Sequence, residues 1–546
     1  MIAVVEAMRA GLFRRDNVLR NVVAGVVVAI IGLPLAMAFA IASGAKPEAG
    51  IYTSIVAGAA VSLFGGSRVQ ISGPTSAFIG VLVGVSSVYG LEGLQVATIM
   101  AGIMMFSFGV FKCGRMIKFI PEQVITGFTA GIAVNMLSSQ IPNFFGMQCG
   151  QLPSNLHEKI AIFSKTFHTA DVATALLATA SLILMLVSQK TFLRKIPGPL
   201  IALGFGIAFQ AIFRFGSVAT IGSVFGGLPS KLPSPTPMAS LPFDVMQKLL
   251  APAFAIAMLG SIESLLCAVI SDSLTGVRHS SDQELIGHGI ANVVSPLFGG
   301  IASTGSIART VASVKMGNNC PITGLACALF LCFVVRFLSP LAKFIPLSVL
   351  SAILFIVAIR MMNCKHFCNL LIHAPKSDAI VLVLTFALTL FCGIVMAVNV
   401  GIMLSALMLM HRMAGSSHVD RVKSMKRTDY DFSQLPEGIA VYTIVGPIFF
   451  GMMDKFSSAL SSTENTDRVI ILRMFDVPFI DATGLENLKL SFDSLKKRGK
   501  AIMLSETMAP VMAKLKRFRV LDGATLKMAG KSIVEVIDAA NRMLHG

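Results

Sequence analysis

The sequence predicts an all-α polytopic membrane domain followed by a small α/β domain. Of its 546 residues, 54% are hydrophobic and only 13% are charged. A soluble domain of this length would carry far more charge. Apolar runs of about the length of a membrane span recur through residues 1–412. The pattern then changes to short alternating strands and helices, which indicates a second domain.

Fourteen apolar segments are long enough to cross a bilayer, with some shortened by breaks. They lie near residues 21–42, 51–66, 74–89, 93–111, 123–142, 171–188, 197–215, 248–270, 284–299, 304–317, 320–339, 346–361, 377–392 and 394–412. Lys and Arg are concentrated in the loops that a cytoplasmic N-terminus would place inside. We therefore expect a multi-pass protein of the cell inner (plasma) membrane with both termini in the cytoplasm. The first 20 residues lack a short apolar core before a cleavage site, so no cleaved signal peptide is expected.

A Pro-rich break at residues 226–242 separates two halves of seven spans each, about 1–225 and 243–412. Because seven is odd, the second half is inserted upside down relative to the first. The third span of one half begins with SGPTSAF at residues 72–78, and the third span of the other begins with STGSIAR at 303–309. Two interrupted segments at matching positions predict a binding site near the membrane midplane of an inverted-repeat transporter.

Residues 413–436 are polar and basic, and they are predicted to link the membrane domain to an α/β domain at 437–546. Strands are predicted at 439–445, 469–474 and 500–504, and helices near 452–460, 485–498, 508–517 and 531–544.

Composition argues against several other functions. The net charge of +17 is spread over short clusters between apolar runs, so nucleic acid is not an expected partner. Nine Cys occur in apolar segments and are typical of small buried hydrophobes. The cluster at Cys364–Cys368 has no standard zinc spacing and is predicted to be a loop between helices. We expect no metal and no cofactor other than a coupling ion, and no arrangement of residues indicates an enzyme.

Short motifs throughout the chain together resemble the SulP/SLC26 anion transporters. They are GLPLAMAFA at 32–40, GGSR at 65–68, SGPT at 72–75, IP at 120–121, GFTAG at 127–131, IESLL at 262–266, DSLTG at 272–276, QEL at 283–285, PLFGG at 296–300 and IART at 307–310. The segment FIDATGL at 479–485 is similar to a STAS domain. The resemblance is closest to bacterial members, including the dicarboxylate-transporting branch. It implies two inverted seven-span repeats arranged as a core and a gate domain, a homodimer, and a regulatory STAS domain that could bind a cytoplasmic protein.

The starts of the third and tenth spans form the candidate substrate site. Its residues are Thr75, Ser76 and Ala77 on one side and Thr304, Gly305 and Ser306 on the other. Two helix N-termini that meet present unpaired N–H groups and partial positive charge, which bind an anion without a full fixed charge. The alternative is that these small residues only permit close helix packing.

Three larger side chains complete the prediction. Arg309 could add a positive field or a bidentate contact to an oxyanion, or it could be a structural charge paired with an acid or carbonyl groups. Phe39 occupies a position that the resemblance places against the anion, although on physical grounds it is core packing. Glu263, an acid within the eighth span, could carry a proton or contribute to a Na⁺ site. We favour the proton; the alternative is an acid that neutralises Arg309.

In the second domain, Thr483 stands where bacterial STAS regulators carry a phosphorylatable Ser, but a helix N-cap or turn residue is the preferred interpretation. Leu35 stands where many SulP/SLC26 members have Gln, so the substrate stays open among sulfate, bicarbonate and C4-dicarboxylates.

The predicted function is secondary active anion transport, with proton symport favoured over a Na⁺-coupled bicarbonate symporter and over a passive channel or exchanger. A nucleobase permease is disfavoured by Arg309 and by the STAS-like domain. A membrane receptor that signals to the soluble domain is a further alternative.

Overall fold

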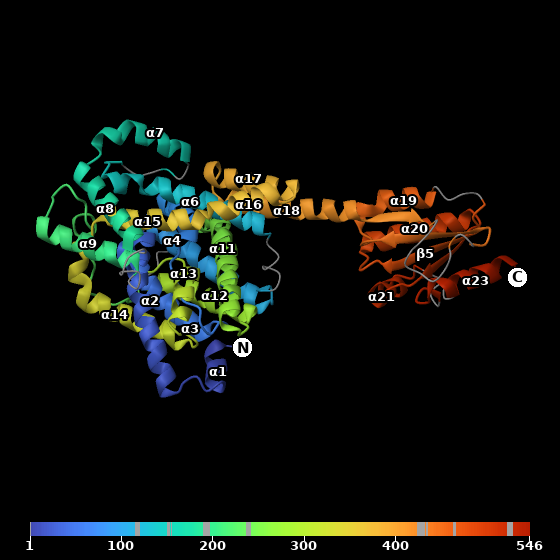
Figure 1. The fold of residues 1–546 in the computed structure, drawn as a ribbon, viewed down its shortest axis with the longest axis horizontal. Coiled ribbons are helices and arrows are strands. Elements are labelled where there is room, and N and C mark those ends of the chain that lie inside the picture. The colour runs from blue at the N-terminus through green and yellow to red at the C-terminus, as the bar shows by residue number, and fades with distance from the viewer. Residues whose placement is uncertain are drawn as a thin grey trace. The chain divides into compact units, whose positions relative to one another are not determined.

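The computed structural model describes most of the chain and divides it into two compact units, Met1–Met403 and Leu404–Gly546 (Figure 1). The described residues are 2–114, 121–149, 153, 156–188, 197–235, 242–422, 432, 435–461, 466–520 and 528–545. The basic residues at 115, 118, 190, 194 and 195, on which the predicted orientation partly rests, lie outside this set, as do Ile120 of the IP motif and residues 236–241 of the Pro-rich break.

Helices occupy every predicted span, and the last of them begins in the first unit and ends in the second. They are α2 (Arg15–Ala42), α3 (Pro47–Phe64), α4 (Ile79–Val110), α6 (Glu122–Phe145), α8 (Val172–Ser188), α9 (Gly198–Phe213), α11 (Phe243–Thr275), α12 (Ser281–Leu297), α13 (Ile307–Lys315), α14 (Ile322–Ala342), α15 (Leu347–Met362), α17 (Lys376–Phe391) and α18 (Ile394–Ser416). The predicted third and fourth spans both lie in α4, where Gly90 breaks the helix with a φ of +68°. By length and composition, eight helices in the described part could cross a membrane, or nine if a pair bent by 114° counts as one span.

Several short helices were not predicted. They are α1 (Ala3–Arg9), α7 (Leu156–Thr166), α10 (Ile221–Phe225) and α16 (Cys364–His373). The prediction of a loop at Cys364–Cys368 is therefore wrong, because these residues begin α16. Asn363 adopts a left-handed conformation that separates α15 from α16, and Asn tolerates that conformation better than most residues. Within the described ranges no group of three His, Cys, Asp or Glu could hold a metal ion.

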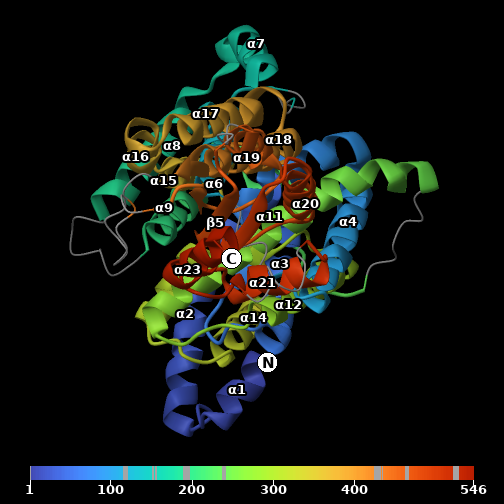
Figure 2. The same ribbon diagram turned by 90° about the vertical axis from the view of Figure 1, so that its right-hand side faces the viewer.

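The helices of the first unit form two groups that each draw on both halves of the chain (Figures 1 and 2). One group packs α4 against α11 and α12, α3 against α12, and α14 against α2 and α3. The other packs α6 against α15 and α17, and α8 against α9 and α15. Glycines allow the closest approach: a Cβ at Gly289 of α12 would lie 2.5 Å from the backbone N of Phe106 on α4. This grouping is the arrangement that an interleaved core and gate would have.

The second unit is a four-stranded sheet with helices. Its elements are β3 (His418–Arg421), β4 (Ile439–Val445), α19 (Met453–Ser461), β5 (Val469–Asp476), α20 (Ala482–Lys497), β6 (Ala501–Ser505), α21 (Ala509–Arg517) and α23 (Ile533–His545). The order is β3-β4-β5-β6, in which β4, β5 and β6 are parallel and β3 pairs antiparallel with β4. The three predicted strands are confirmed. β3 lies in the predicted linker and was missed because a short, polar edge strand has the composition of a loop.

Candidate anion-binding site

Two strand-like segments far apart in the sequence meet at the centre of the first unit. β1 (Ser72–Gly73) pairs antiparallel with β2 (Thr304–Gly305), with Ser72 opposite Gly305 and Gly73 opposite Thr304. The N–H of Ser306 extends the pairing by donating to the carbonyl of Ile71 at 2.9 Å. The interrupted segments at matching positions of the two halves are therefore directly hydrogen-bonded to each other.

A helical segment begins immediately after each strand. The 3-10 turn η1 (Ser76–Phe78) follows the N-cap residue Thr75 and leads into α4, and α13 follows the N-cap residue Ser306. Neither N-cap side chain makes a capping hydrogen bond, and first-turn N–H groups have no partner within their own helix. Thr75, Ser76 and Ser306 are only partly buried, and Ala308 is exposed. The start of α13 is therefore accessible and suited to an anion.

The side chains of the predicted residues do not all point to this accessible side. Thr304 is buried, and its Oγ1 lies 2.7 Å from Oγ of Ser264 and donates to the carbonyl of Gly260 at 3.2 Å. Gly305 is also buried, and its N–H donates to Oγ of Ser264 at 3.2 Å. Both residues thus attach β2 to α11. Ser76 contacts the other helix group through Sδ of Met361 on α15, at 3.2 Å.

Arg309 connects the two halves from the first turn of α13. Its side chain is buried, with only 3% exposed, and Nη2 donates to the carbonyl of Pro74 at 2.6 Å. Glycines make room for the guanidinium, because a Cβ at Gly73 would lie 2.8 Å from Nη1 and a Cβ at Gly32 would lie 3.2 Å from Cδ. Its Nε makes no hydrogen bond within the described residues. Arg309 therefore places a positive charge beside β1, and its Nε–H donor has no partner among the described residues.

Glu263 lies on α11 close to two attachments of that helix to β2 and α13. One is Ser264, already described, and the other is Cys267, whose Sγ donates to Oγ1 of Thr310 at 3.3 Å. Glu263 is partly buried. In the described part of the chain it forms neither a hydrogen bond nor an ion pair with Arg309. The contact that charge neutralisation would require is absent there.

The remaining two predicted residues lie in different settings. Phe39 on α2 is 6% exposed and belongs to the large apolar cluster that also contains Ile71, just before β1, and Ile79, the first residue of α4. Thr483 lies in the second unit, exposed in the first turn of α20. The N-cap of α20 is Asp481, whose Oδ1 accepts from the N–H of Gly484 at 2.6 Å. The N-cap interpretation of Thr483 is therefore wrong by two residues.

Sequence reasoning missed the residues that support the site. Gly260, Ser264 and Cys267 form one face of α11, and all three contact β2 or α13 directly or through a hydroxyl. Their spacing of four and three residues is the helical repeat that places side chains on one face. That spacing around Glu263 was readable from the sequence, but the partner segment was not.

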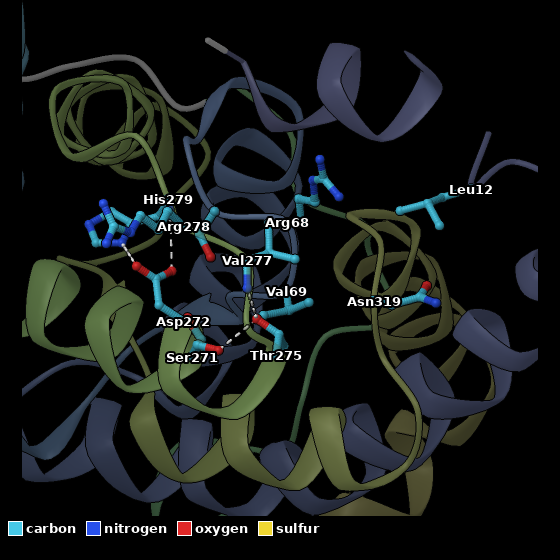
Figure 3. A pocket seen from close by; sticks show the side chains of 11 residues that line it. Leu12, Arg68, Val69, Ser271, Asp272, Thr275, Val277, Arg278, His279 and Asn319 are labelled. Carbon is cyan, nitrogen blue, oxygen red and sulfur yellow. Dashed lines mark hydrogen bonds and ion pairs between the residues drawn. The ribbon is translucent and has the colours of Figure 1, made fainter. Parts of the chain in front are cut away.

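A cavity of about 170 Å³ lies away from the β1–β2 pair, between Arg68 and the connection from α11 to α12 (Figure 3). On one side of it, Asp272 accepts from the backbone N–H of His279 at 3.0 Å and pairs with Nδ1 of the same residue at 2.7 Å. Arg68 donates to Glu6 at 2.5 Å. Arg68 and His279 beside this cavity thus already have acidic partners.

Comparison with known proteins identifies the membrane unit. The model of the sulfate permease family matches residues 18–385, and the STAS domain model matches residues 433–529. The chain belongs to the sulfate permease family. This confirms the resemblance to SulP/SLC26 transporters, and it means that the protein is a multi-pass membrane transporter and not an enzyme.

Two curated relatives match over most of their length. A putative sulfate transporter of Bacillus subtilis (strain 168), YvdB, is 37% identical over 490 residues, covering 89% of this chain and 91% of the relative. The bicarbonate transporter BicA of Picosynechococcus sp. is 30% identical over 499 residues, covering 86% of each chain.

Solved structures share the fold. The overall structure of SLC26A9 aligns with a TM-score of 0.88 at 17% identity, covering 99% of this chain and 93% of that one. The transmembrane domain of a cyanobacterial bicarbonate transporter, BicA, aligns with a TM-score of 0.62 at 28% identity, covering 71% and 97%. The all-α membrane fold with a C-terminal STAS domain is therefore confirmed.

Proposed function

We propose that this sulfate permease family member is a secondary active transporter of oxyanions, with the anion held at the starts of α4 and α13. The pairing of β1 with β2 carries the proposal, because it brings two helix starts and the buried Arg309 into one place. Unpaired N–H groups and a partly used guanidinium attract an anion together, and neither requires a metal.

Sulfate and bicarbonate are the first candidate substrates, since relatives that match most of this chain are named for them. A C4-dicarboxylate stays a candidate because its carboxylate oxygens would meet the same N–H donors. Leu35 favours no member of this group, because its side chain offers no hydrogen bond to a bound anion.

Transport would proceed by movement of one helix group relative to the other. The N-cap region of α4 belongs to the group with α11 and α12, while Met361, which Ser76 contacts, belongs to the group with α6 and α8. An anion bound beside Ser76 would therefore lie at the boundary between the groups, where a relative movement changes its access.

Protons are the proposed coupling ion, and Glu263 is the proposed carrier. Glu263 immediately precedes Ser264, whose hydroxyl bonds to β2. Within the described ranges the Glu263 carboxyl group forms no ion pair with Arg309. A carboxyl group without a fixed cation can gain and lose a proton more readily than one that neutralises a neighbour. Na⁺ at the same carboxylate is the alternative.

The proposal places the protein in the cell inner membrane as a homodimer with both termini in the cytoplasm. The STAS domain would regulate transport, either by binding a cytoplasmic protein or through Thr483, which is exposed and so accessible to modification.

Purified protein in proteoliposomes tests the function. Uptake of labelled sulfate, bicarbonate and fumarate is measured with an imposed pH gradient, with a Na⁺ gradient, and with neither. We expect concentrative uptake of at least one anion that requires the pH gradient and is lost in Glu263→Gln. Uptake that follows only the anion's own gradient would establish the channel or exchanger, and dependence on Na⁺ would establish Na⁺ symport.

Deletion of residues 437–546 separates transport from signalling. We expect the deleted protein to retain uptake at an altered rate. Complete loss of uptake from a protein that is still folded and inserted would show that the STAS domain does more than regulate.

A further inference from the structure

A buried acid–histidine pair lies in α12, one turn apart and outside the site described above. The side chains of Glu284 and His288 are each 0% exposed, and Oε1 of Glu284 lies 3.2 Å from Nε2 of His288. The other carboxylate oxygen, Oε2, accepts from the N–H groups of Gly66 and Ser67 at 2.6 and 2.8 Å. One oxygen thus accepts from two backbone N–H groups, whereas the other, among the described residues, lies beside the imidazole alone.

Gln70 joins this pair to the anion site. Its Nε2 lies 3.1 Å from Nε2 of His288, and its side chain is 4% exposed. Nε2 of Gln70 also packs against Gly305, so closely that a Cβ on Gly305 would lie 1.8 Å from this nitrogen. Because Gly305 is opposite Ser72 in the β1–β2 pair, a single side chain separates His288 from the segment that begins α13.

Three polar atoms of the cluster formed by Gln70, Glu284 and His288 have no hydrogen-bond partner within the described residues. They are Oε1 of Gln70, Oε1 of Glu284 and Nδ1 of His288. Buried polar atoms without partners are rare, because each costs free energy. When Nε2 of His288 carries no proton, it can accept a hydrogen bond from the NH₂ group of Gln70. A proton on Nε2 can instead be donated to Glu284, and the Gln70 amide must then turn to present its oxygen.

When the Gln70 amide turns, its carbonyl oxygen replaces its NH₂ group in the position beside Gly305. Protonation also adds a positive charge to a buried group a short distance from the helix starts. Both changes are local, and both occur beside the backbone that would bind the anion.

We propose that Glu284 and His288 hold a proton whose presence is transmitted through Gln70 to the anion site. The inference rests on the proposed anion transport and deepens it by adding a second protonation site to Glu263. Since protonation makes the cluster more positive, the bound proton strengthens anion binding. The KM for the anion therefore falls as the pH is lowered.

Among the described residues, few other charged or titratable groups lie near the pair on the elements packed against α12. On the segment before β1, Arg68 is paired with Glu6 at 2.5 Å. On α11, the thiol of Cys267 lies within the electrostatic influence of Glu284, Glu263 and Arg309. Where glycines bring α3 and α4 close to α12, at Phe64 and Gly65 and at Gly102 and Phe106, the contacts are made by backbone and apolar groups.

The experiment measures anion KM from pH 5.5 to 8.5 in proteoliposomes containing the full-length protein. The probe is whichever of sulfate, bicarbonate and fumarate the wild type transports best. The variants are His288→Gln and His288→Asn, which keep a polar side chain without the titration. The matched control is His279→Gln, because His279 is also buried and paired with an acid, Asp272, but lies at the separate cavity (Figure 3).

One coupled proton changes KM by up to about tenfold per pH unit. We expect the wild type and His279→Gln to show the same pH dependence, and at least one His288 variant to lose about half of it or more while keeping its maximal rate at low pH. Wild-type pH dependence in both His288 variants overturns the inference. A wild type whose KM does not change with pH also overturns the inference. Uptake that does not require the pH gradient overturns proton coupling itself, which is a separate failure.

A second measurement does not depend on the folding of a His288 variant. Calorimetry of anion binding in buffers of different ionisation enthalpy counts the protons taken up per anion. If Glu263 is the only site, Glu263→Gln takes up none. We expect Glu263→Gln to retain a measurable fraction of the wild-type proton uptake, and zero uptake would overturn the inference.

Discussion

Replacing Gly305 by Ala tests the contact on which the anion site depends. The added Cβ would lie 1.8 Å from Nε2 of Gln70 and 2.7 Å from its Cδ, and 3.2 Å from Cβ of Cys267. Ordinary contacts between heavy atoms are about 3.5 Å or longer. The Gln70 amide must therefore withdraw by more than about 1.5 Å, and His288 blocks its retreat because its Nε2 is only 3.1 Å away.

The expected cost combines two effects. Adding a methyl group to a closely packed core costs about 1–3 kcal/mol, and displacing a buried hydrogen-bonded amide costs about 1 kcal/mol more. If about 2–4 kcal/mol is expressed at the site, kcat/KM for the anion falls by roughly 30-fold to 1,000-fold. The β1–β2 pair should shift more than the helices around it, because the clash is between a residue of β2 and the side chain of Gln70.

The assay is initial-rate uptake in proteoliposomes, with Gly84→Ala as the control. Gly84 lies in α4, and a Cβ there would meet nothing within 4 Å. The double variant Gly305→Ala with Gln70→Ser removes the atoms that clash, and we expect it to recover at least a part of the lost transport. If Gly305→Ala transports at the wild-type rate, or if shortening Gln70 brings no recovery, the inferred contact is not the one that matters.

Three further predictions follow from single contacts. Arg309→Lys removes the planar donor fork that reaches the carbonyl of Pro74 at 2.6 Å, so anion KM should rise by about tenfold or more; an unchanged KM in uptake assays would assign Arg309 a purely structural role. Gly50→Ala would place a Cβ 1.9 Å from the carbonyl oxygen of Ala36, so α2 and α3 must separate. The midpoint of thermal unfolding in detergent should therefore fall by several degrees, whereas Gly84→Ala should leave that midpoint unchanged. Asp481→Ala removes the cap bond to Gly484, which should weaken the first turn of α20 by about 1 kcal/mol; hydrogen exchange there should then be about fivefold faster, and unchanged exchange would contradict the assignment of the cap.

The sequence alone was sufficient for the class of protein and for the two interrupted segments that pair with each other. Apolar runs of membrane-spanning length predicted the helices, because hydrocarbon requires every backbone polar group to be bonded within the helix. The break at residues 72–78 and its counterpart at 303–309 predicted where two half-helices would meet, and β1 and β2 pair there. Alternating apolar strands and helices likewise predicted the sheet of β4, β5 and β6.

Only the tertiary structure decided what each side chain in the site does. Thr304 was predicted to face the anion, but it bonds to Ser264, a partner 40 positions away in the sequence. Glu263 and Arg309 could have formed an ion pair, since both are charges within apolar segments, and the choice of Pro74 as the partner of Arg309 depends on how the two halves cross.

The cluster of Gln70, Glu284 and His288 shows the same limit most clearly. A Glu and a His four residues apart are visible in the sequence, and on an isolated helix they would be ordinary neighbours on a solvated face. Their complete burial and their contact with Gln70 arise because α12 packs against α3 and α4 through glycines. Periodicity determines which face a residue occupies, whereas the packing of distant segments determines what that face meets.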